Sequence, residues 1–100
     1  MSIRHIVMWK LVTDDAAEKA EHTEQLRAAL EGLIAIIPEV QGLTVRQNVL
    51  HDGDNFDVVL DSFFDNAADL ATYAGHPAHK EAGLIVKALT KARAAVDIEF

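Results

Sequence analysis

The segment Tyr73–Gly83, with the sequence YAGHPAHKEAG, holds a tyrosine and two histidines, His76 and His79, within seven residues. An imidazole whose pKa partial burial holds near neutrality can act as a general base at physiological pH. A buried tyrosine presents an apolar ring and one hydroxyl, which either pairs inside the protein or serves a ligand. These residue types therefore allow general acid–base chemistry, provided that the fold brings them to one place.

His79 is the strongest candidate for such a base. If a helix begins at the proline before it, its steps to Ala82, Gly83 and Val86 place it on the buried face of that helix. A buried imidazole needs a hydrogen-bond partner for at least one ring nitrogen. Two interpretations stay open: His79 is a base facing a cavity, or it is a core residue satisfied by Tyr73 or by a backbone carbonyl.

The other histidines have different expected roles. His76 directly precedes Pro77, so we expect it to shape the start of a helix. His5 lies on a predicted strand and points inward, where it either packs or joins the candidate site. His22 falls on a polar helix face and His51 in a turn, so both are predicted to be surface residues.

Other site chemistries find little support. The chain has no cysteine, which excludes disulfides, thiolate nucleophiles and cysteine-ligated zinc. His76 and His79 have the helical i, i+3 spacing of a metal pair, but no third ligand lies near them in the sequence. Neither a phosphate-binding glycine loop nor a Ser/His/Asp signature is present. We therefore expect neither a metal nor an organic cofactor.

Four segments have the composition of strands. Ile3–Leu11 is short and rich in Ile, Val and Trp, and Leu43–Leu50 follows a turn at a glycine. The Asp-Gly pair within HDGDN then predicts a hairpin leading into Phe56–Phe64. Ala94–Phe100 alternates apolar and acidic residues as a last strand.

A long amphipathic helix is predicted between the first two strands. Asp15 is its expected N-cap, with Glu18 three residues later, and Pro38 ends it. Its apolar stripe recurs at steps of four, three and four residues: Leu26, Leu30, Leu33 and Ile37.

Two shorter helices fill the second crossover. The first is capped by Asp65 or Asn66 and closes with Gly75 as a C′ residue. The second begins at Pro77 and runs through Lys91. The order is β-α-β-β-α-β, which predicts an α+β, ferredoxin-like sandwich with a four-stranded antiparallel sheet and helices on one face.

Such a one-sided cover leaves the other face of the sheet to be explained. We expect this face to carry Ile6, Met8, Val59 and Phe63, together with Asp57 and Asp61. The opposite set faces the helices: His5, Val7, Trp9, Leu11, Phe56, Val58, Leu60 and Phe64. An exposed apolar patch of this kind usually marks an interface, and two such faces packed about a two-fold axis make a homodimer.

Composition limits the possible partners. One hundred residues make one domain, residues 1–100, and a net charge of −7 without a local basic cluster argues against nucleic acid. No apolar stretch reaches the ~20 residues that a membrane span needs. The N-terminal apolar run is broken by Arg4, His5 and Lys10, so it is a poor signal peptide. We expect a cytoplasmic protein.

The sequence resembles the stress-responsive dimeric α/β-barrel family over its whole length. The resemblance is carried by IRHIVMWKL at the start, IIPEVQGL after the first helix, YAGHPAH and an aromatic-ended last strand. It implies that two ferredoxin-like protomers pair their sheets into one barrel. Most members of the family have no assigned reaction.

The resemblance also implies roles for individual residues. A plant polyketide cyclase of this family, which has a similar HPAH segment, closes a linear tetraketide by aldol condensation without any cofactor. By this likeness His79 would be the general base, Tyr73 would position or polarise the substrate, and His5 would be a further pocket residue. Val58 stands where the cyclase has a pocket histidine, so the likeness does not extend to its substrate.

Three functions therefore stay open. The first is a homodimer that binds a small, largely apolar molecule. The second is a cofactor-free enzyme, either a polyketide-cyclase-like lyase or a monooxygenase. The third is a structural stress protein without a ligand. An accessible cavity that joins His5, Tyr73 and His79 would favour the first two, and a filled core would favour the third.

Overall fold

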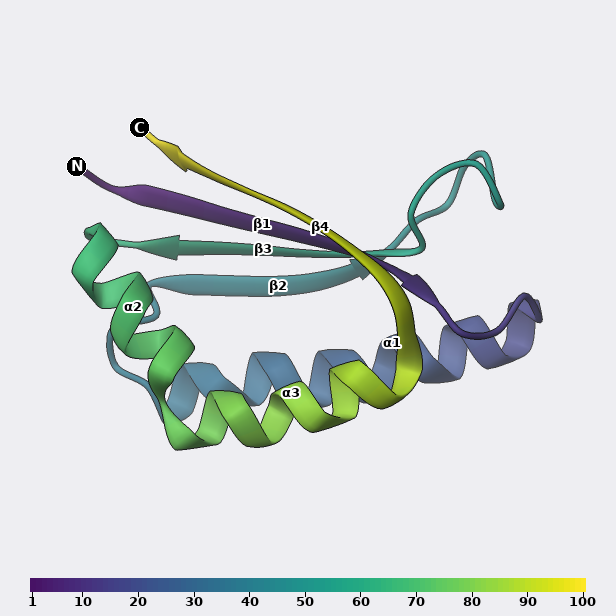
Figure 1. The fold of residues 1–100 in the computed structure, drawn as a ribbon, viewed down its shortest axis with the longest axis horizontal. Coiled ribbons are helices and arrows are strands. Elements are labelled where there is room, and N and C mark those ends of the chain that lie inside the picture. Colours follow the sequence, from purple (N-terminus) through teal and green to yellow (C-terminus); the bar gives the residue numbers. More distant parts are fainter.

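The first strand, β1 (Ile3–Leu11), lies inside a four-stranded antiparallel sheet with the strand order β2-β3-β1-β4. The computed structural model describes all residues, 1–100. The other strands are β2 (Gly42–Gln47), β3 (Val58–Phe64) and β4 (Thr90–Glu99). This arrangement confirms the predicted ferredoxin-like fold, and β1 has the predicted bounds (Figure 1).

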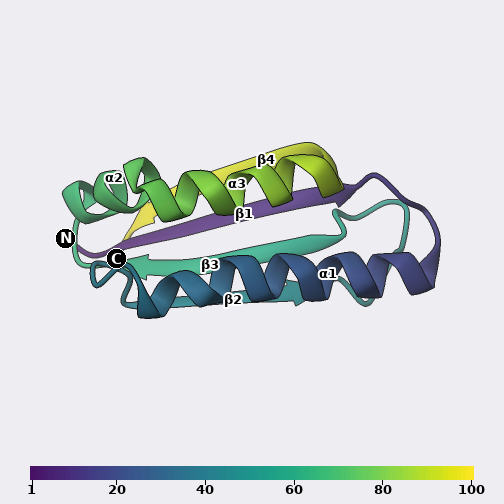
Figure 2. The ribbon, with the colours of Figure 1, turned by 90° about the horizontal axis from the view of Figure 1, so that it is seen from below.

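All helices cover the same face of the sheet. α1 (Ala16–Glu31) continues into a 3-10 turn, η1 (Gly32–Ala35), and α2 (Ala67–Gly75) leads directly into α3 (Pro77–Leu89). Seen from the helix side, α1 runs along β2 and β3, whereas α3 runs along β1 and β4 (Figure 2). Even α1, the longest helix with 16 residues, is too short and too polar to cross a bilayer.

Each of the three α-helices begins at a side-chain cap. The Asp15 carboxylate accepts a hydrogen bond from the Glu18 backbone N–H at 2.9 Å, as predicted. Asn66, rather than Asp65, caps α2. His76 Nδ1 accepts from the Ala78 N–H at 3.0 Å, directly before the proline that opens α3. Such caps satisfy backbone donors that have no partner within the helix.

The core lies between the sheet and the helix layer. Alternate residues of β1 and β3 point into it, because successive strand side chains face opposite sides. α1 supplies Leu26 and Leu30 of the predicted stripe from the other side. The helix ends at Glu31 rather than at Pro38, so Leu33 comes from η1 and Ile37 from the segment after it. The buried residues at the centre are Val7, Trp9, Leu11, Leu26, Leu30, Leu33, Ile37, Val58, Leu60, Phe64 and Tyr73.

The end of α2 differs from the prediction. Gly75 is the last helical residue and does not adopt a left-handed conformation, which among the glycines only Gly53 does. The chain leaves the helix at His76, whose backbone is extended with φ −67° and ψ 138°. Pro77 provides the reason, since a proline disfavours the α conformation of the residue before it.

The alternation predicted for the third strand fails before Val58, where β3 begins. Asp57 was expected on the open face of the sheet, but it is buried: it accepts from the Leu11 N–H at 2.8 Å and from Lys19 Nζ at 3.0 Å. Phe56 was expected to face the helices. It lies instead beneath the Lys10 ammonium, 5.7 Å from its ring centroid, and borders a hollow of about 350 Å³ beside Met8 and Val59.

Three further boundaries moved. β2 ends at Gln47 rather than at Leu50, and α3 ends at Leu89, two residues before the predicted end. β4 starts at Thr90 rather than at Ala94, because its pairing with β1 extends to Leu11, past a register shift in β1.

His22, predicted to be at the surface, is half-buried, and its Nδ1 is buried without a hydrogen-bond partner.

The open face of the sheet carries the predicted apolar side chains. Ile6, Val59 and Phe63 lie there, joined by Val96 and Ile98 of β4, which are 49% and 41% exposed. One ion pair interrupts this surface: the Arg4 guanidinium binds Asp61 through two hydrogen bonds of 2.9 and 2.7 Å. This pairing lowers the pKa of the Asp61 carboxyl.

Candidate functional site

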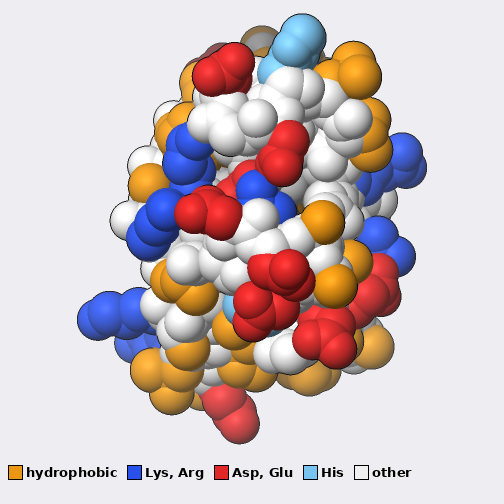
Figure 3. All heavy atoms as spheres, turned by 90° about the vertical axis from the view of Figure 1, so that its right-hand side faces the viewer, with side chains coloured by type: hydrophobic (Ala, Val, Ile, Leu, Met, Phe, Trp, Pro, Cys, Tyr) orange, Lys and Arg blue, Asp and Glu red, His pale blue; other side chains and the backbone are white.

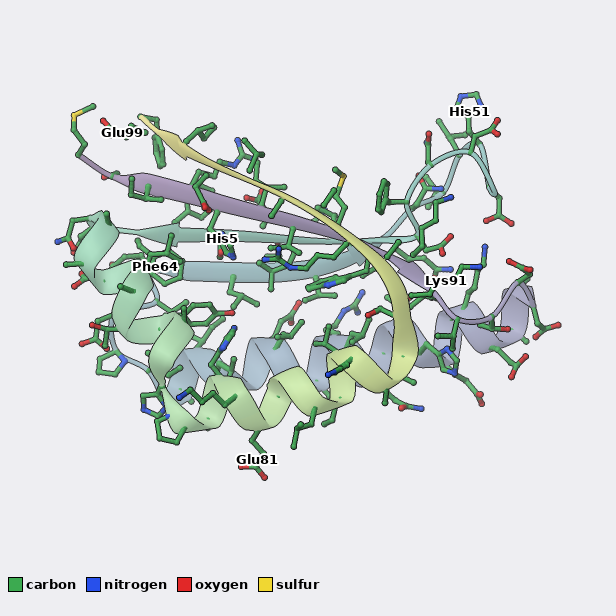
Figure 4. The ribbon with its side chains drawn as sticks, viewed as in Figure 1. His5, His51, Phe64, Glu81, Lys91 and Glu99 are labelled. Carbon is green, nitrogen blue, oxygen red and sulfur yellow. The ribbon has the colours of Figure 1, made fainter.

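A cavity of about 180 Å³ lies between the sheet and the third helix. His5 comes from β1 in the sheet, Tyr73 from α2 and His79 from α3, so the three predicted site residues meet in one place. Figure 4 shows His5 on the side of the sheet that faces the helices. The rest of the wall is largely apolar: Val7, Trp9, Leu30, Leu60, Gly83, Val86 and Arg93.

His79 lies in the first turn of α3, where the His76 cap and Pro77 fix the direction of the helix. Its ring meets the ring of Tyr73 edge to face, with 4.5 Å between the centroids and 61° between the planes. Burial lowers the pKa of His79, and a hydrogen bond to the Ala74 backbone opposes this shift without cancelling it. The imidazole is therefore neutral at pH 7, and a neutral imidazole has one nitrogen that can accept a proton.

Tyr73 is almost completely buried, with 1% of its surface exposed. Its ring also packs against Phe64, at 5.1 Å between centroids, so its position is set from two sides. Burial raises the pKa of its hydroxyl to about 12. Tyr73 thus stays a neutral phenol at physiological pH and can donate a hydrogen bond into the cavity.

His5 is paired with a residue that the sequence reasoning missed. Its Nδ1 contacts the carboxylate of Asp97 on the neighbouring strand β4, which leaves Nε2 as the nitrogen available to a ligand. The His5 side chain is 15% exposed, whereas that of Asp97 is 53% exposed. A carboxylate in this position fixes the orientation of the ring.

Arg93 is the second cavity residue that was missed. Both residues follow from the pairing of the last strand with the first, in which Asp97 stands opposite His5 and Arg93 opposite Trp9. The alternation of Ala94–Phe100 separated the apolar residues from the acidic ones but did not say which set faces the helices, and Arg93 precedes this segment. The register between the two strands, which the pattern does not contain, decides both points.

The other histidines lie outside the cavity. His76 uses Nδ1 to cap α3, His22 is on α1, and His51 lies at an exposed loop with a positive φ of 52°. Nowhere do three or more His, Asp or Glu side chains assemble as a metal site. The chemistry available in the cavity is therefore that of one neutral imidazole, one phenol and one histidine–carboxylate pair.

Comparisons with known proteins agree with this architecture. Residues 3–100 match the model of the stress responsive A/B barrel domain family. A dimeric protein of unknown function with a ferredoxin-like fold, from Bacteroides fragilis, is 36% identical with a TM-score of 0.87, covering 99% of this chain and 96% of its own. A dimeric ferredoxin-like protein of unknown function from Thermobifida fusca is 26% identical, with a TM-score of 0.82 and coverages of 100% and 92%.

A hydroxynitrile lyase from Passiflora edulis shares the fold at 18% identity, with a TM-score of 0.79 and coverages of 97% and 91%. A search of functionally curated proteins found no match. At this level of identity the lyase provides evidence of a shared fold only.

Proposed function

Because the chain belongs to the stress responsive A/B barrel domain family, we propose that it forms a homodimer and binds a small, largely apolar molecule in the cavity between its sheet and α3. One observation carries the proposal: His5, Tyr73 and His79 line a single cavity with an otherwise largely apolar wall. A well-filled core would leave no such space, since protein interiors pack nearly as densely as organic crystals.

The size of the cavity limits the ligand. At about 180 Å³ it is close to the ~150 Å³ of an engineered cavity that holds benzene. One ring or a chain of about six carbons therefore fits inside, with polar atoms directed at the two histidines and the tyrosine. Most of the binding free energy would come from removing apolar surface from water, at roughly 25 cal/mol per Å².

Association through the open face of the sheet supports the homodimer. Met8, Val96 and Ile98 are each exposed by more than a third in the isolated chain, and Ile6, Val59 and Phe63 lie between them. A second copy packed sheet to sheet would bury this surface about a two-fold axis. The solved relatives from Bacteroides fragilis and Thermobifida fusca are dimeric.

A second candidate function is proton abstraction next to a carbonyl, as in a cofactor-free lyase or cyclase. The specific observation in its favour is the state of His79: a neutral imidazole beside a neutral phenol. In this mechanism His79 takes the α-proton, and Tyr73 donates a hydrogen bond to the enolate oxygen that forms. His5, oriented by Asp97, would present Nε2 to the substrate. The hydroxynitrile lyase from Passiflora edulis has the same fold, which supports this candidate.

Both functions can be tested with one small ketone, 2-heptanone. NMR titration in water measures binding, and loss of the α-proton signals in D2O measures proton abstraction. We expect shifts at Gly83 and Val86 upon binding. If the α-protons of 2-heptanone exchange faster with the protein than in buffer alone, and His79→Ala removes this acceleration, the catalytic candidate is established. Binding without exchange would leave the ligand-binding function alone. Absence of both would remove the proposed function and favour a structural role.

A further inference from the structure

Three cations surround one opening of the cavity: Lys87 at the end of α3, Lys91 at the start of β4 and Arg93 two residues later. We call them the basic rim. They line a second hollow of about 290 Å³ that shares Trp9, Gly83, Val86 and Arg93 with the inner cavity. The hollow and the cavity are thus adjoining parts of one depression.

The strand register gives this depression two chemically different ends. Along the helix-facing side of β4, Asp97 lies opposite His5, whereas Arg93 lies opposite Trp9. They are four positions apart, a distance of about 13 Å at the usual rise. Ala95 lies between them on the same side.

The basic rim has no counter-charge within the protein. None of the ion pairs of the fold involves Lys87, Lys91 or Arg93, although the chain carries 16 acidic residues and a net charge of −7. Figure 4 shows Lys91 where the chain turns from α3 into β4, whereas Glu81 of the same helix points away from the sheet. In the end-on view of Figure 3, basic side chains lie on the left flank, the side of α3 and β4, as well as on the right, and most acidic ones lie between them.

Gly83 forms the passage between the two hollows. It lines the inner cavity in the middle of α3, and a Cβ atom added to it would meet no atom within 4 Å. Glycine is unfavourable inside a helix. At position 83 the missing side chain leaves free space beside Arg93, and any larger residue at this position would fill that space.

We propose that the ligand of the cavity is a carboxylate, seated with its charged group at the basic rim and its apolar body in the inner cavity. This proposal rests on the ligand-binding function above and adds the charge and orientation of the ligand. The orientation follows from solvation. An anion in the apolar inner part would lose its water of hydration without a cationic partner, whereas an anion at the rim keeps part of its hydration and has cations beside it. The planar fork of Arg93 matches the two oxygens of a carboxylate.

The test compares hexanoate with hexanamide, which have the same chain and differ in charge, by NMR titration of the intact protein. Wild-type protein should bind hexanoate about tenfold more tightly, as expected for a charge-assisted hydrogen bond at a partly hydrated site. Arg93→Gln should abolish this preference, because it should lower the affinity for hexanoate far more than the affinity for hexanamide. Lys87→Gln should reduce the preference in part. Lys80→Gln, which removes the same charge from an exposed position on the same helix, is the matched control and should have no effect.

The outcomes separate the two proposals. Equal affinity of the wild-type protein for both probes would leave ligand binding intact and overturn the carboxylate assignment, as would an equal loss of both affinities in Arg93→Gln. Failure of both probes to bind would overturn ligand binding and the carboxylate assignment together. Tighter binding of hexyl phosphate than of hexanoate would replace the carboxylate by a phosphate and overturn the assignment as stated.

Discussion

The imidazole of His79 and the ring of Tyr73 meet edge to face, with their centroids 4.5 Å apart, although the residues lie on different helices. The break at His76 and Pro77 makes this contact possible, because it ends α2 and starts α3 in a new direction. His79 in the first turn of α3 then meets Tyr73 in the last turn of α2. The pair therefore depends on the cap that His76 supplies. The two histidines of the HPAH segment have separate roles, one in geometry and one in the cavity.

The first prediction distinguishes these roles. His79→Ala should leave the protein folded and abolish ligand binding, because it removes a cavity wall with a polar atom. His76→Ala should lower the free energy of unfolding by about 1 kcal/mol through loss of the α3 cap and weaken binding far less. Thermal melts and 2-heptanone titrations of both variants provide the measurement. If His79→Ala binds normally and only melts earlier, by a cost of ~1–3 kcal/mol, His79 is a core residue.

The second prediction concerns pH. The pKa of His79 lies below 6.5 in the folded protein because of burial, so the unfolded chain binds more protons in the range just below 6.5. The contribution of His79 to the free energy of unfolding is therefore complete above 6.5 and lost as the pH falls through the folded value. Melting temperatures from about pH 5 to 7 should fall more steeply with acidification in wild-type protein than in His79→Gln. Parallel curves for the two proteins would contradict the burial of this ring.

The third prediction concerns assembly. Sedimentation equilibrium at micromolar concentration should give a mass near twice the 10.9 kDa of the chain. Val59→Asp places a charge on the open face of the sheet and should weaken association and stability together, because obligate dimers fold and associate as one unit. Val49→Asp, in a loop position that is 87% exposed, is the matched control. A single-chain mass for the wild-type protein would rule out the homodimer.

The fourth prediction separates stability from binding at Gly83. Gly83→Ala should raise the free energy of unfolding by roughly 0.5–1 kcal/mol, since alanine suits a helix interior better. Gly83→Leu should close the passage and reduce the affinity for 2-heptanone, because a side chain at this position starts in open space beside the cavity. Gly32→Ala, at a glycine in right-handed helical conformation outside the cavity, should raise the free energy of unfolding without changing the affinity for 2-heptanone. Unchanged affinity in Gly83→Leu would show that ligands do not reach the cavity at this point.

Local patterns predicted most of the fold. The bounds of β1 and the Asp15 cap depend on neighbours in sequence, and both were predicted correctly. Asp57 was misplaced because its burial depends on Lys19 and on the Leu11 N–H, which are 38 and 46 residues away. For the same reason, Asp97 and Arg93 were not recognised as cavity residues: a strand pattern shows which residues share a face but not which residues of the next strand they meet.

The alternation within β1 divides a single strand between two tasks. His5, Val7 and Trp9 face the cavity, whereas Arg4, Ile6 and Met8 face away from the helices. Substitutions at odd-numbered positions can thus retune what the protein binds without touching the open surface, and those at even-numbered positions can do the reverse. Deleting or inserting one residue in this strand would instead exchange both sets at once, so ligand specificity can diverge in such a scaffold by replacement of side chains but not by changes in strand length.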